Sequence, residues 1–461
     1  MKTTFLFFLI LIFIGIDSFS QYKPFPQNVN YPYGYKPASI TSDFVKSDYL
    51  TLKQKFVVEC GETYRVKYET PSQTRGEAIG FVMILSAYMG DRELFDGLFK
   101  FYKSKLTTQA KGMMAWNVTC EGIEDPGSAT DIDIDVAFAL VVAYDQWEGN
   151  YLEEAEKIIK LLETYMITTC NGVKVLYPGY SGVPWGGCNE TDIQYYTPGF
   201  FRIFAKVSGN KVWDQLADDS YILLNNSADE ITGLVPDWQK ANGEPTASRE
   251  KNYKYDACRV PWRMSLDYLW NGNSKAQTWC KKISDWAYDI GPANIKDGYK
   301  LDGTPAGSNH NSAFTGGLAV SAMCNNQDMV NDFGAELKKI NDNYWFNNCT
   351  RSLYLFTLSG NFWKPVKYDP SSSTGEVKKN EIEVFPNPSK EGKFTVNFGV
   401  NQNSWGKFKI EVYDSAGKMV YSESMTKNQS SCIIDLGTQK GVFIIKVRGK
   451  DIDYSTKLIV E

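Results

Sequence analysis

The sequence predicts an all-α domain built from two concentric rings of helices, followed by a small antiparallel β-sandwich. Helical patterns joined by loops that contain glycine, asparagine and proline fill most of the chain, and strand signals there are few and short. Several helical segments are apolar on nearly all sides, which indicates helices buried inside a ring of others. After a polar linker the composition changes to short β-rich runs separated by turns, which predicts the sandwich.

Length and composition limit the classes of function. A chain of 461 residues can bury a large core and can hold more than one domain. The net charge of −5 offers no basic surface, so no nucleic-acid partner is expected. With one histidine and no Cys-x-x-Cys pair, a zinc site has few ligands to draw on, and we expect neither a metal nor a cofactor. The aromatic share of 14% suits stacking on sugars but also suits a large core.

The first twenty residues are typical of a secretory signal peptide. A basic Lys2 precedes an apolar run over residues 5–16, and small residues follow up to Ser20. The run is too short to span a bilayer, and no later stretch is long and apolar enough to do so. We therefore expect a signal peptide at residues 1–20 and an exported protein with no membrane span.

Domain boundaries follow from the change in composition. We expect the helical domain at residues 21–365, a linker at 366–380 and the β-sandwich at 381–461. The long loops 170–195 and 232–255 are expected to gather at one rim of the helical domain. The expected helices cover residues 43–59, 77–90, 94–104, 129–147, 151–166, 197–208, 214–227, 260–269, 275–287, 313–323, 329–340 and 351–359.

The cysteines allow disulfide bonds without proving them. Nine are present, an odd number. Cys170 and Cys188 bracket a loop that contains glycine and proline, and they are the pair that we expect first to be bonded.

The segment Ala129–Trp147 combines three carboxylates with a buried helix. Asp131, Asp133 and Asp135 fall in the first turn, where unpaired N–H groups and the helix dipole favour negative charge. Carboxylates at the mouth of a buried helix are well placed for an active site on a rigid scaffold. Helix capping is an equal alternative for Thr130 and Asp131. A calcium loop is disfavoured because valines occupy the positions where an EF-hand needs glycine and glutamate.

Acidic residues near helix starts indicate acid and base chemistry. Glu77, Asp131 and Asp256 are the candidates. A carboxylate beside Arg259 should keep a low pKa, whereas one packed among apolar residues should have a raised pKa and hold a proton. Hydrolysis of a glycosidic bond needs such a pair. His310 as the only histidine leaves little room for a serine triad, and no phosphate-binding loop is present.

The segment Ala-Thr-Asp-Ile-Asp-Ile-Asp at 129–135 resembles the signature of glycoside hydrolase family 8. Motifs at 76–83, 233–238, 255–263 and 358–363 support this resemblance in the right order, so that it covers residues 45–365. The resemblance implies an (α/α)6 barrel and inverting hydrolysis of β-1,4-linked glycans.

The resemblance also implies a role for each candidate residue. Glu77 would be the general acid, Asp256 the general base, and Asp131 would hold the sugar at the cleavage point. Asp133 and Asp135 are then interpreted as the helix start that holds Asp131 in place. Arg259 and Tyr195 would help to place the attacking water. Trp116 and Trp185 would stack on neighbouring sugars.

The sequence departs from the family pattern around the acidic glutamate. Gly76 and Ala78 stand where the family usually has serine and glycine on either side of Glu77. Val82 replaces a glycine, and Ile132 replaces the usual alanine between the first two aspartates. We expect these changes to crowd the backbone near Glu77 and to alter the shape of the cleft.

The C-terminal region resembles the sorting domain of the Bacteroidetes type IX secretion system. The resemblance lies in Val-Phe-Pro-Asn-Pro-Ser at 384–389, Val-Tyr-Asp-Ser-Ala-Gly-Lys at 412–418, Gly-Val-Phe-Ile-Ile-Lys-Val at 441–447 and a final Lys-Leu-Ile-Val. It implies a partner in the type IX machinery, passage across the outer membrane, and then release or surface attachment.

These observations favour a secreted inverting endo-β-1,4-glycanase acting on cellulose-like β-glucan. A xylanase, a chitosanase and a non-catalytic glycan-binding protein are the alternatives; Asp256 argues mildly against chitosanase, since chitosanases tend to place the base elsewhere. The leading hypothesis expects the carboxyls of Glu77 and Asp256 to face each other across a cleft at about 6.5 to 9.5 Å. The sequence does not select the polysaccharide or endo over exo action.

Overall fold

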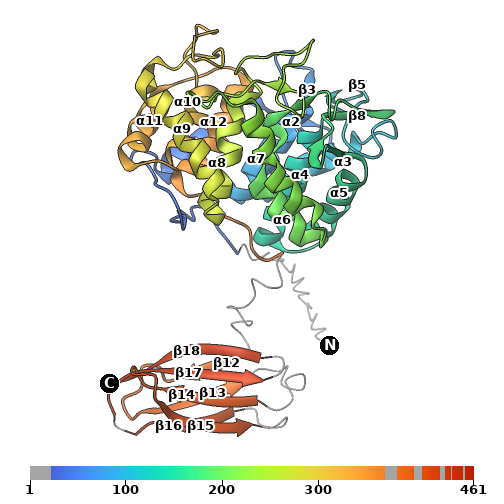
Figure 1. The fold of residues 1–461 in the computed structure, drawn as a ribbon. Coiled ribbons are helices and arrows are strands. Elements are labelled where there is room, and N and C mark those ends of the chain that lie inside the picture. Colours follow the sequence, from blue (N-terminus) through green and yellow to red (C-terminus); the bar gives the residue numbers. More distant parts are fainter. Residues whose placement is uncertain (1–21, 369–381, 399–407, 426–430, 438, 450–451) are drawn as a thin grey trace, which may run out of the picture. The chain divides into compact units, whose positions relative to one another are not determined.

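The computed structural model describes residues 22–368, 382–398, 408–425, 431–437, 439–449 and 452–461 (Figure 1). The chain divides into two compact units between Tyr368 and Asp369. The predicted signal peptide at 1–20 and most of the predicted linker at 366–380 lie outside the described residues.

The larger unit is an (α/α)6 barrel, as predicted (Figure 1). Its helices alternate along the chain between an outer and an inner ring. The outer helices are α1 (Ser42–Phe56), α3 (Arg92–Ser104), α5 (Tyr151–Tyr165), α7 (Val212–Ser227), α9 (Ser274–Ile290) and α11 (Gln327–Lys339). The inner helices are α2 (Gly76–Met89), α4 (Thr130–Trp147), α6 (Pro198–Ser208), α8 (Val260–Asn271), α10 (Ser312–Ala322) and α12 (Trp345–Ser359).

Burial separates the two rings. Nearly every residue of α2, α4 and α10 is buried, as expected for helices that are apolar all round. The outer helices bury one stripe; in α3, Leu94, Leu98 and Phe101 are buried while Lys100 and Lys103 are exposed. The ring closes because α12 packs against α2.

Each predicted helix is present, and most ends differ by a few residues. The largest difference is α12, which begins at Trp345 rather than at residue 351. Its first turns contain Asn347 and Asn348, which are buried although they are polar. The apolar pattern that predicts a helix is therefore interrupted in this part of the sequence. None of the helices in the described ranges combines the length and apolarity needed to cross a membrane.

Short hairpins and 3-10 turns occupy the connections between the helices. Strands β3, β5 and β8 lie at one end of the barrel (Figure 1, top right). The strands of this unit are β1 (Val57–Cys60), β2 (Thr63–Val66), β3 (Gln73–Arg75), β4 (Asn117–Thr119), β5 (Ile123–Asp125), β6 (Ile167–Cys170), β7 (Val173–Leu176), β8 (Gly179–Ser181), β9 (Val183–Trp185), β10 (Thr191–Asp192) and β11 (Trp238–Gln239). The 3-10 turns are η1 (Ile193–Tyr195), η2 (Ala257–Arg259) and η3 (Pro292–Asn294).

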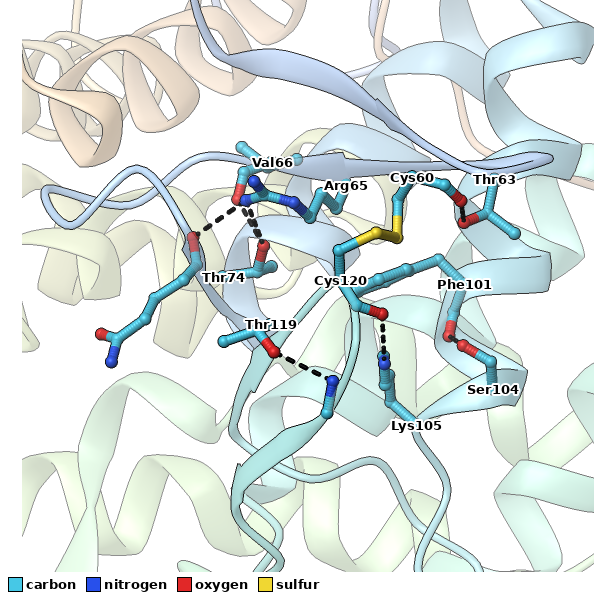
Figure 2. The surroundings of a disulfide bond; sticks show 12 residues. Cys60, Thr63, Arg65, Val66, Thr74, Phe101, Ser104, Lys105, Thr119 and Cys120 are labelled. Carbon is cyan, nitrogen blue, oxygen red and sulfur yellow. Dashed lines mark hydrogen bonds between the residues drawn. A yellow bond between two sulfur atoms is a disulfide. The ribbon is translucent and has the colours of Figure 1, made fainter.

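Two disulfide bonds fasten these hairpins. The predicted bond between Cys170 and Cys188 is present. A second bond joins Cys60, at the end of β1, to Cys120, just after β4 (Figure 2). Lys105 donates a hydrogen bond of 2.9 Å to the backbone oxygen of Cys120 and so ties the same loop to the end of α3. The sequence did not predict this second pair because 60 residues separate its cysteines.

The start of α4 differs from the capping interpretation. The N-cap is Ala129, which makes no side-chain cap, and the Thr130 hydroxyl instead donates to the Tyr177 carbonyl at 2.6 Å. Asp133 accepts a hydrogen bond of 2.5 Å from the Tyr102 hydroxyl, and burial raises its pKa to about 7. Asp135 forms a buried two-pronged ion pair with Arg263. Asp133 thus lies in the first turn of α4 as predicted, whereas the placement of Asp135 in that turn was wrong, and both residues fasten α4 to neighbouring helices.

The smaller unit consists of two antiparallel sheets with strand orders β12-β13-β16 and β15-β14-β17-β18, as the sequence predicts for a sandwich. Its core contains Phe394, Ile410, Ile434, Phe443 and Leu458, one from each of five strands. The strands are β12 (Ile382–Phe385), β13 (Lys393–Phe398), β14 (Phe408–Tyr413), β15 (Met419–Met425), β16 (Ser431–Asp435), β17 (Gly441–Gly449) and β18 (Ile452–Val460).

The buried ion pair between α4 and α8 gives a test of the barrel. Asp135→Asn leaves the Arg263 guanidinium buried without a counter-charge, so we expect the barrel to lose about 3–5 kcal/mol in its free energy of unfolding. Urea unfolding followed by tryptophan fluorescence measures this loss. Glu244→Ala, which removes the exposed pair with Lys240, is the control and should cause no resolvable change. Equal stability of the Asp135 variant and the wild type would contradict the structural role.

Candidate active site

A cleft of about 700 Å³ opens among the N-terminal ends of the inner helices. Glu77 lies in the first turn of α2, Asp131 in the first turn of α4, and Asp256 directly before η2 and α8. All three line the cleft together with Arg259. The barrel thus brings together carboxylates from three helices that are far apart in the sequence.

Arg259 connects the three carboxylates. One terminal nitrogen, Nη1, donates to Glu77 Oε2 at 2.8 Å and lies 3.6 Å from Asp131 Oδ2. The other, Nη2, donates to Asp256 Oδ1 at 2.7 Å. The Arg259 side chain is only 3% exposed, so its charge is compensated by these groups rather than by water.

The geometry limits the separation of the two outer carboxylates. Because the terminal nitrogens of one guanidinium are about 2.3 Å apart, the bonded oxygens of Glu77 and Asp256 lie no more than about 8 Å from each other. This limit overlaps the expected range of about 6.5 to 9.5 Å and excludes a much longer separation.

The environment favours the protonated form of Glu77. Removal of water by the surrounding protein, together with the negative charges of Asp131 and Asp256, raises its pKa to about 7 against the lowering effect of Arg259. We expected any carboxylate beside Arg259 to keep a low pKa. That expectation is wrong for Glu77 and for Asp131, because the effect of desolvation on their pKa outweighs that of the shared guanidinium.

Hydrogen bonds orient the other two carboxylates. Gln194 Nε2 donates to Asp131 Oδ2 at 3.1 Å, and burial raises the pKa of Asp131. Trp238 Nε1 donates to Asp256 Oδ2 at 2.9 Å. Asp237 accepts from the backbone nitrogens of residues 254 and 257, each at 2.8 Å, and so fixes the turn that carries Asp256.

Aromatic side chains form the walls of the cleft. Trp116, 36% exposed, and Tyr195 line it directly. Trp185 does not line the same cavity; its ring stacks on Trp238, with centroids 6.1 Å apart, and Trp238 lines the cleft. Trp238 also meets Tyr195 edge-on. The predicted stacking residue Trp185 therefore extends the aromatic surface beyond the cavity that holds the carboxylates.

Two residues of the site, Trp238 and Asp192, were not predicted from the sequence. Trp238 stood in a segment that resembles a family motif, but its bond to Asp256 depends on the pairing of β10 with β11. Asp192 is buried, lines the cleft, and its pKa is raised well above the ordinary value by burial and by the charge of Asp256. It sits inside a predicted loop, where no periodicity marks a buried residue.

Two departures from the family pattern lie against each other. A Cβ atom at Gly76 would collide with the Cδ1 atom of Ile132, so the isoleucine occupies the space that a side chain at position 76 would need. Both residues line the cleft beside Glu77. Gly76 leaves space for the Ile132 side chain, which makes the lining of the cleft apolar beside Glu77.

Comparison with known proteins now adds to this geometry. Residues 35–359 match the model of glycosyl hydrolases family 8. The chain belongs to this family. It is 33% identical over 388 residues to Endoglucanase 2 of Ruminiclostridium josui, covering 80% of this chain and 82% of that protein. It is 32% identical over 367 residues to Endoglucanase A of Acetivibrio thermocellus, covering 74% and 75%.

A solved structure agrees with the fold of this family 8 barrel. The apo structure of a β-1,3-1,4-glucanase from Paenibacillus sp. X4 superposes with a TM-score of 0.67 at 27% identity, over 75% of this chain and all of that chain. Family membership and the endoglucanase relatives together show that the protein is a glycoside hydrolase.

The smaller unit matches a different model. Residues 383–461 match the secretion system C-terminal sorting domain. The domain indicates that this family 8 hydrolase is secreted through the type IX system to the cell surface or beyond.

The pKa of Glu77 gives a test of the site. We expect Asp131→Asn to lower this pKa from about 7, because the variant removes a negative charge and leaves Arg259 with one fewer carboxylate to neutralise. Infrared difference titration of the carboxyl stretch measures it, with Glu77→Gln identifying the band. Asp218→Asn on the outer surface of α7 is the control and should leave the pKa in place. An unchanged value in the Asp131 variant would show that the two groups do not interact.

Proposed function

We propose that the barrel is an inverting endo-β-1,4-glycanase that acts on cellulose-like β-glucan. One observation carries the proposal: the Arg259 guanidinium holds Glu77 and Asp256 on either side of an open cleft, and the pKa of Glu77 is raised to about 7. In this arrangement one carboxyl group can protonate the leaving oxygen, and the other can activate a water molecule. The names of the endoglucanase relatives support the choice of β-glucan.

The proposed mechanism assigns one task to each group. Glu77, protonated near neutral pH, donates its proton to the glycosidic oxygen as the bond to the anomeric carbon breaks. Asp256 takes a proton from the water that attacks the opposite face of the sugar, while Trp238 and Arg259 hold its two oxygens in place. Asp131, oriented by Gln194, binds the hydroxyls of the sugar at the cleavage point.

The remaining site residues bind the chain and the water. Arg259 and Tyr195 lie beside Asp256 and contribute to the position of the attacking water. Trp116 on one side and Trp185, next to Trp238, on the other offer ring faces to neighbouring sugars.

Export completes the proposal. Residues 1–20 act as a signal peptide for the first membrane, and the sorting domain at 381–461 directs the second step. Secretion suits a hydrolase whose substrate is too large to enter the cell.

Substitution of the two carboxyls tests the mechanism. We expect Glu77→Gln and Asp256→Asn each to lower the rate of β-glucan hydrolysis by a factor of about 10² to 10⁴, because each removes a proton donor or acceptor. A reducing-sugar assay on cellulose, lichenan, xylan and chitosan measures the rate, and affinity electrophoresis on the same glycans measures binding. Asp218→Asn is the matched control. A wild type that binds glucan but hydrolyses none of the four glycans would instead indicate a glycan-binding protein, and preference for xylan would identify a xylanase.

The stereochemistry of the product separates the two possible mechanisms. The limit of about 8 Å between oxygens also includes the shorter separation used by retaining enzymes. We expect the first product from a β-linked oligosaccharide to be the α-anomer, which proton NMR detects before mutarotation. Initial release of the β-anomer would show that Asp256 acts as a nucleophile.

A further inference from the structure

An arginine held between two aromatic rings forms one wall of the cleft. Arg75 is the last residue of β3, two positions before Glu77. Its guanidinium carbon lies 4.2 Å from the ring centroid of Tyr68 and 4.7 Å from that of Trp116. All three residues, called the Arg75 stack below, line the cleft. The pairing of Arg75 with Asn117 across β3 and β4 sets this arrangement, because Asn117 follows Trp116 directly.

The charge of Arg75 has no partner within the described part of the protein. None of its nitrogen atoms has a carboxylate within ion-pair distance, and none donates a hydrogen bond from the side chain. Its Nη1 atom is covered by protein and still has no acceptor. The Arg75 side chain as a whole is partly exposed and lines the cleft, so a ligand bound there can supply an acceptor to the accessible edge of its guanidinium.

A second stack with the same composition differs in its charge. Arg249 lies 5.2 Å from the ring centroid of Trp185 and 4.5 Å from that of Trp238. Its Nε atom donates to Glu190 Oε1 at 2.9 Å, so this arginine is neutralised by the protein. The two stacks offer similar aromatic surfaces, but only the Arg75 stack leaves a cation without an anion.

The rest of the cleft is acidic. Besides the three carboxylates around Arg259, Asp192 and Asp342 line it. An anionic group on a sugar is repelled near these residues, and it finds a compensating charge at Arg75. A carboxylate suits the planar guanidinium better than a hydroxyl does, because it accepts two parallel hydrogen bonds and carries the opposite charge.

We propose that the Arg75 stack is a subsite for a sugar that carries a carboxylate, such as a uronic acid unit or an acidic side group of a β-linked glycan. The sugar lies against Trp116, and its carboxylate accepts hydrogen bonds from Arg75. The proposal rests on the proposed function, since it assigns a substrate class to one side of the same cleft. It makes the protein a hydrolase that tolerates, and prefers, acidic substitution at one position along the chain.

A matched pair of substrates tests the subsite. The first is a soluble β-1,4-glucan in which a fraction of the C6 hydroxymethyl groups is oxidised to carboxylate. The second is the same preparation after its carboxyls are reduced back to hydroxymethyl groups. The measured quantity is the ratio of kcat/KM on the acidic glucan to kcat/KM on the reduced glucan. This ratio cancels any general effect of a substitution on folding or on the chemical step.

We expect Arg75→Gln to lower the ratio by about tenfold or more, because the variant loses a charge-assisted hydrogen bond. Arg75→Lys should lower it less, since it keeps the charge but loses the planar fork. Arg249→Gln is the matched control and should keep the wild-type ratio, because Glu190 already neutralises that arginine. The wild-type ratio should also fall as salt is raised.

The outcomes separate this inference from the proposed function. If the wild type hydrolyses the reduced glucan and Arg75→Gln keeps the wild-type ratio, the acidic subsite is wrong while the proposed function stands. If the wild type hydrolyses neither preparation, the proposed function is wrong. The ratio of dissociation constants for the two glucans, measured by titration calorimetry on the wild type and on Arg75→Gln, then decides the subsite alone: an equal ratio in both overturns it.

Discussion

A single buried guanidinium determines the arrangement of the active site. Arg259 carries one positive charge and meets three carboxylates, two in the first turns of α2 and α4 and one directly before η2. A charge this deeply buried needs compensation, and carboxylates gathered this closely need a cation between them. Both requirements are met only if the first turns of the helices that carry Glu77 and Asp131 lie near η2. The closure of the barrel therefore fixes the distances on which acid and base chemistry depends.

Glu77 and Asp256 have different surroundings although both contact Arg259. Trp238 donates a second hydrogen bond to Asp256, which stays 32% exposed. Glu77 shares its nitrogen of Arg259 with Asp131 and gains no other charged donor. One shared cation thus gives two chemically similar groups unequal contacts, which suits the proposed roles of Glu77 as proton donor and Asp256 as proton acceptor.

Local patterns in the sequence predicted the fold well, because the period of apolar residues records which face each helix buries. The assembly of the site was predictable only in part. Glu77 and Asp256 are 179 residues apart in the sequence. Short motifs, rather than the period of apolar residues, predicted that they belong to the same site. The bond from Trp238 to Asp256 and the pairing of Cys60 with Cys120 depend on how loops cross in three dimensions. No local pattern encodes such crossings.

The contact between Gly76 and Ile132 has a consequence for how this cleft can change in evolution. A side chain at 76 requires the Cδ1 end of Ile132 to move, and a small residue at 132 beside Gly76 leaves unfilled space in the lining of the cleft. The effects of substitutions at the two positions are therefore coupled, because the size of each residue sets the space available to the other.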